Sequence, residues 1–235
     1  MADRNPMNEA RPPLSRERIL IAAVGLADEG GIEALSMRKL AAALGVEAMS
    51  LYNHVANKDD LIDGILDLVV GEIQLPPDGE PWDAAIRQGA ASAHRVLMRH
   101  PWACSLVITH TSPRPGPSAR LRYIEWLLGR LRDAGLSAEL TYHAYHAINS
   151  HILGYTFWEL GHSMAANSLG GGEDFAVAAQ RFLQSLPAHE FEHLIEHARQ
   201  HFQEPWPDTI DGFEFGLELI LDGLKRHRPD GPGLT

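Results

Sequence analysis

The sequence predicts an all-α protein built of two parts, and three observations carry this prediction. Apolar residues recur at helical spacing through most of the 235 residues, whereas β-branched residues are sparse and period-two alternation is not sustained. A stretch dense in Pro and Gly at 75–81 cannot continue a helix and marks a boundary. Among the Phe, Trp and Tyr residues, only Tyr52 precedes residue 80. A small module poor in aromatic residues is therefore followed by a larger module rich in them.

The composition restricts the class of protein. The net charge of -11 lies entirely after residue 58, because residues 1–58 hold as many basic as acidic side chains. The chain has one cysteine and so no intrachain disulfide, and no apolar run is long enough for a signal peptide or a membrane span. These features predict a cytoplasmic protein whose N-terminal quarter can approach an anionic partner.

Two helices are predicted at the start of the N-terminal module. Residues 1–13 are polar and interrupted by Pro, and we expect a disordered arm there. Ser15 can cap a first helix that Gly30-Gly31 ends, and Ser36 can cap a second helix that Gly45 ends in a left-handed turn. The apolar positions that recur at helical spacing are Ile19, Ala22, Ala23, Leu26 and Ala27, then Met37, Leu40, Ala41 and Leu44.

A third short helix at about 47–54 and a fourth that starts at Asn57 complete the module. Asn57 with Asp60 forms a capping-box-like start for the fourth helix. Its apolar face would consist of Leu61, Ile65, Leu68 and Val69. Two short helices joined through Gly45-Val46 are typical of a helix-turn-helix, whose second helix enters a major groove of DNA. The spacing alone fits an ordinary packed helix pair as well.

Two segments of this module carry a family resemblance. Leu35 to Val46 reads LSMRKLAAALGV, and Leu51 to Leu61 reads LYNHVANKDDL. These segments resemble the DNA-binding part of the TetR family of bacterial transcriptional repressors, which implies a DNA-binding domain at 14–70. The resemblance also implies that Arg38 reaches a guanine through its planar fork. The other DNA contacts that it implies are base contacts from Ala48, Met49 and Ser50 and phosphate contacts from Tyr52, His54 and Lys58, with Asn53 among them.

Three of these positions leave alternatives open. Tyr52 could instead be a core residue that braces the helices. Ala48 and Met49 stand where the family member that binds tetracycline has a Gln and a Pro. The resemblance therefore does not imply the sequence of the operator.

The larger module is predicted to consist of long helices. Two breaks interrupt them, one at 111–117 with three prolines and one at 163–174, where three consecutive glycines predict a mobile loop. The expected helices run over 82–100, 118–134, 138–161, 175–186, 188–201 and 209–227.

Two of these helices are candidates for a dimer interface. The helix at 138–161 is apolar on more than one side, as a helix with two packing partners would be. The helix at 209–227 keeps Gly212 and Gly216, although each costs about 1 kcal/mol of helix propensity relative to Ala, which suggests close backbone approach. Its apolar stripe is Ile210, Phe213, Leu217, Leu221 and Leu224. A large monomeric core would also explain both patterns.

The segment 81–228 also resembles the C-terminal domain of the tetracycline-repressor branch of the family. The matching pieces are Leu75-Pro76 with Trp82, His110 with Arg114-Pro115, Gly135-Leu136-Ser137, Leu153-Gly154 and Gly216-Leu217-Glu218. The resemblance implies a ligand-binding and dimerisation domain, with a pocket among the middle helices and a homodimer formed by a four-helix bundle.

Seven residues are candidates for the lining of a ligand cavity, which would be mostly apolar with a few polar groups. They are Trp102, His110, Tyr123, Trp126, Tyr142, Asn149 and Trp158. Each of them singly could be a core residue instead. The set as a whole favours an apolar or aromatic effector.

Tetracycline is not the expected effector, and no cofactor or metal is predicted. Gly71, Gly89 and Ala93 stand where the tetracycline-binding member of the family has a His, an Asn and a Phe. The polar groups and the ring that would orient the drug are therefore missing. His110 matches the magnesium-binding His of that protein, and a histidine beside a loop, without any ligand, is an equal alternative.

One short motif supports an alternative function. His189-Glu190-Phe-Glu-His193 fits H-E-x-x-H, in which two His on one helical face bind zinc and the Glu is a base. A zinc-dependent hydrolase is therefore the alternative hypothesis, although the further run of His197 and His201 at the same spacing also fits a solvated helix face. The main prediction is a repressor and not an enzyme, which binds a palindromic operator as a homodimer and is released by a small molecule.

Overall fold

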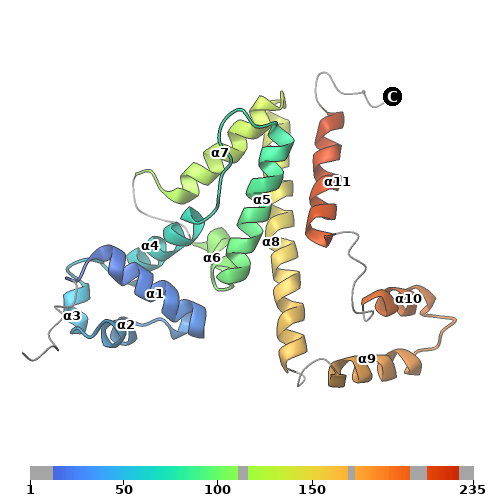
Figure 1. The fold of residues 1–235 in the computed structure, drawn as a ribbon, viewed down its shortest axis with the longest axis horizontal. Helices are drawn as coiled ribbons and strands as arrows, with labels where there is room; N and C mark the ends of the chain where they lie inside the picture. The colour runs from blue at the N-terminus through green and yellow to red at the C-terminus, as the bar shows by residue number, and fades with distance from the viewer. Residues whose placement is uncertain (1–12, 111–115, 169–172, 202–210, 228–235) are drawn as a thin grey trace, which may run out of the picture. The chain divides into compact units, whose positions relative to one another are not determined.

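The computed structural model describes residues 13–110, 116–168, 173–201 and 211–227, and this part of the chain contains helices and no strand (Figure 1). The predicted all-α class is confirmed. The residues form two compact units, one of Met1–Glu72 with Arg99–Arg120 and the other of Ile73–Met98 with Leu121–Thr235. In the described residues, no helix is long and apolar enough to cross a lipid bilayer.

The first unit is built around helix α1, which packs against α2 and α4. Helix α4 in turn packs against α6. The bounds of its elements are Arg16–Gly30 for α1, Ile32–Ala34 for the 3-10 turn η1, Met37–Leu44 for α2, Ala48–Leu51 for α3, Lys58–Gly71 for α4 and Ala103–Thr109 for α6. Their core side chains include Ile19, Leu40, Leu51, Leu61 and Ile65, all of them fully buried.

The predicted helix ends of this unit form as expected. The Ser15 hydroxyl accepts a hydrogen bond from the Arg18 amide, and the Ser36 hydroxyl accepts one from the Lys39 amide. Gly45 ends α2 in the left-handed conformation, with a φ of 68° that a side chain would disfavour. These helix ends depend only on residues close by in the sequence, so they could be predicted without knowledge of the tertiary structure.

Three features of this unit differ from the prediction. Helix α3 ends at Leu51, and Tyr52 to His54 form a turn rather than a last helical turn. Leu68 lies on the exposed side of α4, not on its buried face. Helix α6 was not predicted at all, because a seven-residue helix that follows His100-Pro101 is too short to show a clear helical period.

The second unit contains the longer helices. Helix α11 packs against α8, and both lie in this unit with most of α5 and α7 (Figure 1). The bounds are Trp82–Arg99 for α5, Ala119–Asp133 for α7, Ala138–Ser168 for α8, Glu173–Ser185 for α9, Glu192–His201 for α10 and Gly212–Arg226 for α11. Ile148 and Ile152 of α8 and Phe213, Leu217 and Leu221 of α11 are buried.

The glycines of α11 do mark a close approach, but the partner is in the same chain. A side chain at Gly216 would collide with the His151 ring of α8, and one at Gly212 would collide with the Tyr155 hydroxyl. The His151 ring also bonds through Nε2 to the carbonyl oxygen of Phe213, at 2.8 Å. The prediction that Gly216 lies at the subunit interface is therefore replaced by packing of α11 on α8.

Ion pairs join α11 to α5 at the edge of this core. Arg87 donates two hydrogen bonds to the Glu218 carboxylate, which lowers the pKa of Glu218. The Lys225 ammonium lies 3.2 Å from Asp83 Oδ2. These contacts set the position of α11 along α5.

Two helix bounds of this unit correct the prediction. Helix α8 continues beyond the expected end at Gly161 to Ser168, because Gly161 does not adopt the left-handed conformation that ends helices. The expected loop at 163–174 therefore begins later, and its residues 169–172 lie outside the described part. Helix α10 begins at Glu192 rather than at 188.

Candidate nucleic-acid interface and effector site

The helix-turn-helix presents its predicted base-contacting residues on one exposed surface. Arg38 is exposed in the first turn of α2. Met49 is 73% exposed, whereas Leu51 is fully buried two positions later. Because two positions turn a helix by about 200°, burial of Leu51 directs Met49 outward. Ala48 and Ser50 are half-buried at the sides of the same short helix.

The predicted phosphate-contacting residues follow α3 immediately. Tyr52 is 45% exposed, so its ring is not a core brace of the helices. Asn53 is exposed and His54 half-buried in the same turn, and Lys58 is exposed at the start of α4. The structure therefore brings the turn after α3 and the first residue of α4 to one surface, with side chains that can donate to phosphate.

A part-buried ion pair that was not predicted holds this surface in place. The guanidinium of Arg16 in α1 bonds to both carboxylate oxygens of Asp60, at 2.8 and 2.9 Å, and to the carbonyl oxygen of His54, at 2.9 Å. The Asp60 carboxylate also accepts the Ala56 amide, at 2.9 Å. The turn after α3 is thus tied to α1 and α4. No sequence signal links two charged residues so far apart in the chain.

Trp102, a candidate for the ligand cavity, lies buried in the first unit. Its indole Nε1 donates to Asp28 Oδ1 of α1 at 2.7 Å, and the His100 ring approaches the same oxygen at 2.8 Å. Arg99 and His100 also contact the Glu72 carboxylate at the end of α4. Burial opposes ionisation of Glu72, yet the hydrogen bond from Arg99 and the charge of His100 hold its pKa below the usual value.

His110 also lies in the first unit, beside an ion pair. Its Nε2 is 3.0 Å from the Asp63 carboxylate, which is 3% exposed and also pairs with Arg120 at 3.1 Å. His110 is therefore placed next to a buried carboxylate of α4. The residues Arg114-Pro115 that complete its family match lie outside the described residues. Among the described residues, no group of three His, Cys, Asp or Glu side chains is arranged to hold a metal.

Three other candidates meet in the second unit. The Tyr123 hydroxyl donates to Asn149 Oδ1 at 3.2 Å, and the rings of Tyr123 and Trp126 are 6.4 Å apart. The Trp126 indole donates to the Pro76 carbonyl at 3.2 Å, and its ring lies against Gly89, where a side chain would collide with it. Burial raises the pKa of Tyr123. This aromatic cluster of α7, α5 and α8 is mostly apolar, with the Asn149 amide as its polar group.

The last two candidates lie on the surface of α8. Tyr142 is 61% exposed, and Trp158 is about half exposed with its neighbour Phe157. Helix α11 exposes Phe215 and Leu219 in the same unit. We refer to these five exposed side chains collectively as the α8–α11 apolar surface. It is suited to a protein contact more than to an enclosed ligand.

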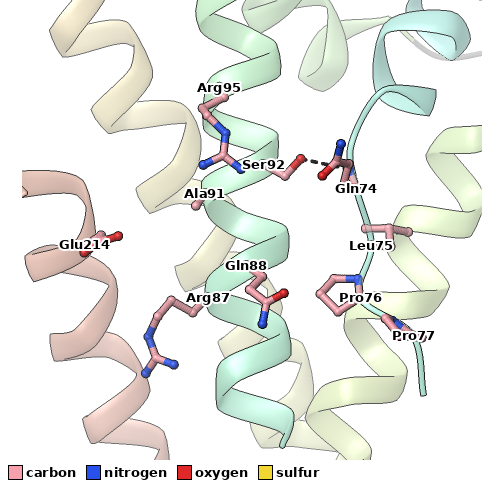
Figure 2. A pocket seen from close by; sticks show the side chains of 10 residues that line it. All are labelled: Gln74, Leu75, Pro76, Pro77, Arg87, Gln88, Ala91, Ser92, Arg95 and Glu214. Atoms are coloured by element: carbon pink, nitrogen blue, oxygen red, sulfur yellow. Dashed lines mark hydrogen bonds between the residues drawn. The ribbon is translucent and has the colours of Figure 1, made fainter. Parts of the chain in front are cut away.

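A groove of about 490 Å³ crosses α5, and none of the seven candidates lines it. Figure 2 shows Arg87, Ala91 and Arg95 along one side of α5, with Gln88 and Ser92 facing the segment 74–77. The Ser92 hydroxyl accepts the Gln74 amide at 2.9 Å. The lining of the groove is partly apolar, from Leu75, Pro76, Pro77 and Ala91, and otherwise polar. In the sequence its α5 residues look like the solvated side of a helix, so they were not predicted to line a ligand cavity.

The zinc-hydrolase alternative is wrong on geometric grounds. The motif requires both histidines on one helical face, but α10 begins at Glu192. His189 and Glu190 lie in the turn before it, and His189 is 81% exposed at its side chain. His193 is the only residue of the proposed triad within the helix.

Comparison with known proteins agrees with this arrangement. Residues 19–65 match the family described as "Bacterial regulatory proteins, tetR family", and residues 75–228 match the "Tetracyclin repressor-like, C-terminal domain". An HTH-type transcriptional regulator of Saccharopolyspora erythraea is 36% identical over 92% of this chain and 87% of its own length. The HTH-type transcriptional repressor DrrR1 of Streptomyces coeruleorubidus is 33% identical over 94% of this chain and 81% of its own length.

The fold has close relatives among solved structures. Apo ActR from Streptomyces coelicolor superposes with a TM-score of 0.71 at 29% identity, covering 92% of this chain and 96% of ActR. ActR has also been solved in complex with actinorhodin. Both halves of the chain thus match one family, over the helix-turn-helix and over the larger helical domain. The chain belongs to the TetR family of bacterial regulatory proteins and is a DNA-binding transcriptional regulator, not an enzyme.

Proposed function

We propose that the protein is a cytoplasmic repressor that binds a palindromic operator as a homodimer and leaves it when a small aromatic molecule binds the second unit. The observation that carries the proposal is the exposed surface of Arg38 and Met49 on a helix pair whose buried side is fixed by Leu51. A rigid helix-turn-helix with an exposed arginine guanidinium can form hydrogen bonds with base edges in a major groove.

The homodimer is proposed to form through α8 and α11. The α8–α11 apolar surface exposes four aromatic rings and Leu219, which a monomer would leave in water. A two-fold dimer places two recognition helices about 34–36 Å apart, or a multiple of that distance, and this symmetry requires an operator of two inverted half-sites.

The effector is proposed to bind at the aromatic cluster of Tyr123, Trp126 and Asn149. Its mostly apolar lining with one amide suits an aromatic guest, and the similar ActR binds actinorhodin. Tetracycline is not expected to bind, because the Trp126 ring occupies the space beside Gly89 where the tetracycline-binding relative carries an Asn. The effector must bind the free and DNA-bound conformations unequally in order to release the operator.

The proposal is tested by operator selection followed by a release assay. Full-length protein is used to enrich duplexes from a random library, and the enriched duplex is then titrated in an electrophoretic mobility shift. Aromatic compounds that include actinorhodin are added to the complex, with tetracycline and magnesium in a parallel series. We expect a palindromic site and release by an aromatic compound that also quenches tryptophan fluorescence.

The two parts of the proposal fail separately. Enrichment of no sequence would contradict operator binding. Release by micromolar tetracycline with magnesium would contradict the assignment of the effector site and leave operator binding intact.

A further inference from the structure

The recognition helix has an unusual chemistry for a surface that reads DNA. Residues 48–57 contain no Asp, Glu, Lys or Arg. The most exposed side chain of α3 is the thioether of Met49, at 73%. Arg38, which can bond to a guanine, comes from α2 instead. Helix α3 therefore offers the major groove an apolar tip rather than a charged one.

Only one of the four bases presents an apolar group to that tip. In the major groove the edges of guanine, cytosine and adenine carry hydrogen-bond donors and acceptors, whereas thymine adds a methyl group at C5. An apolar side chain against a polar base edge would displace water from its donors and acceptors and leave them without hydrogen bonds, which is unfavourable. A flexible, polarisable thioether adapts its shape to a methyl group. The chemistry of the tip thus selects thymine.

The backbone holds Met49 rigidly enough for such a contact. Leu51 and Val55 anchor α3 and the turn after it in the core, and the Val46 amide bonds to the Ala41 carbonyl at 3.0 Å. On the other side, the Arg16 guanidinium holds the carbonyl oxygen of His54. Both ends of the recognition helix are therefore fixed, so the fold sets the position of the Met49 backbone from which the side chain extends.

We infer that Met49 reads the 5-methyl group of a thymine in each operator half-site. This inference rests on the proposed operator binding and adds to it the base that α3 recognises.

The test removes the methyl group without changing base pairing. In the duplex enriched by the selection described above, each thymine of a half-site is replaced in turn by deoxyuridine, in both half-sites together. We expect one position at which the replacement weakens binding of the wild-type dimer about fourfold per half-site, the value for loss of one buried methyl group. For Met49→Ala the thymine and deoxyuridine duplexes should bind equally at that position.

Matched variants separate a base contact from a structural effect. Met49→Leu keeps an apolar chain and should keep most of the discrimination. Ile21→Ala, which shortens an exposed apolar side chain of α1 outside the predicted DNA contacts, should keep all of it. Circular dichroism melting of Met49→Ala should match wild type, because the side chain is exposed. Its non-specific binding to unrelated DNA should be unchanged, because no phosphate contact is removed.

Three outcomes would overturn the inference. The first is an enriched operator with no thymine at which deoxyuridine weakens binding, and the second is discrimination that persists in Met49→Ala. Either result would leave the proposed function standing. The third, a selection that enriches no sequence, would overturn the proposed function together with the inference.

Discussion

The two units of the chain are stabilised by different kinds of contact. In the first unit, buried ionisable side chains join elements that are distant in sequence: Asp63 pairs with Arg120, and His100 bonds to Asp28. Among the described residues of the second unit, the buried polar side chains are Ser92, Thr141 and Thr156, none of them ionisable. Directional bonds fix geometry, and we expect the first unit to behave as a rigid body that matches DNA grooves.

The second unit differs in what it leaves exposed. It carries the α8–α11 apolar surface and also exposes Phe182 of α9, Phe191 just before α10 and Leu194 of α10. Apolar contact is strong but weakly directional, which suits a surface that has to accept a partner and change its packing when an effector binds. The comparison teaches that specificity for DNA and adaptability to ligand are separated along the chain. Four predictions test that separation.

The largest effect is expected from a charge in the α8–α11 apolar surface. Leu219→Glu should convert the proposed dimer to a monomer, because burial of a polar group without a partner costs about 2–7 kcal/mol and burial of a charge costs more. Operator affinity should fall by more than about a hundredfold, since one recognition helix then binds alone. Analytical ultracentrifugation and a mobility shift measure the two effects.

A matched control comes from the other unit. Ile21 of α1 is 59% exposed, close to the 60% of Leu219, and Ile21→Glu should sediment as a wild-type dimer. A Leu219→Glu protein that remains a dimer would remove α11 from the proposed interface.

The next effect tests the reading surface of the first unit. Arg38→Ala should cost about 1–3 kcal/mol of operator affinity and relax specificity at one base pair. Lys58→Ala should weaken binding to all sequences alike and reduce the slope of log affinity against log salt by about 1. Titration of both variants at several salt concentrations distinguishes the two roles. Wild-type affinity in a folded Arg38→Ala protein would contradict the docking of α2 beside a guanine.

Local signals account for what could be predicted from the sequence. Ser15, Ser36 and Gly45 set helix ends by contacts with neighbours three or four positions away, so their residue types were sufficient. The family resemblance over 35–61 placed Arg38 and Met49 on the surface that the structure exposes. The positions of these two residues are set within one helix-turn-helix, which is short enough to be recognised from the sequence.

Long-range contacts account for what could not be predicted. Gly216 was correctly expected to permit a close approach, but sequence alone does not distinguish His151 of the same chain from a partner subunit. Trp102 and His110 were grouped with Tyr123 because they are aromatic or polar, whereas the fold places them in the first unit, bonded to Asp28 and next to Asp63. The arrangement of chemically similar residues between units requires the tertiary structure.

A smaller effect is expected from the ion pair that ties α1 to α4. Arg16→Gln should lower the free energy of unfolding of the first unit by about 1–2 kcal/mol, because Asp60 loses a bidentate partner at a part-buried site. Operator affinity should fall as well, since the turn after α3 is then free to move, although Arg16 itself does not contact DNA in the proposed complex. Arg16→Lys keeps the positive charge but loses the bidentate hydrogen bonds of the guanidinium. It should recover part of the stability and little of the operator affinity. Chemical denaturation and a mobility shift on the same samples measure both, and undiminished affinity in Arg16→Gln would contradict a positioning role.

The smallest effect concerns His94, a histidine in the packing of the second unit. His94 of α5 stacks on Phe213 of α11 at a centroid distance of 4.5 Å, and its ring bonds to Thr156 Oγ1 of α8 at 2.8 Å. Burial lowers the pKa of His94, and the nearby His151 lowers it further. The negative charges of Glu159 and Asp211 act in the opposite direction but do not cancel the effect of burial.

The sign of the pH dependence follows from that direction. Because the folded state holds the pKa of His94 below the unfolded value of about 6.5, the unfolded chain binds the proton more readily. The stability that neutral His94 contributes is present above that pH and is lost as the pH falls through the folded pKa. Acid should therefore loosen the packing of α5, α8 and α11 in the second unit.

His94→Gln should flatten the decline of the unfolding free energy below about pH 6.5. His143→Gln, at an exposed position of α8, should leave that decline unchanged. Titration of the His94 ring protons by NMR measures the pKa directly, and a value above about 6.5 would contradict burial as the dominant cause.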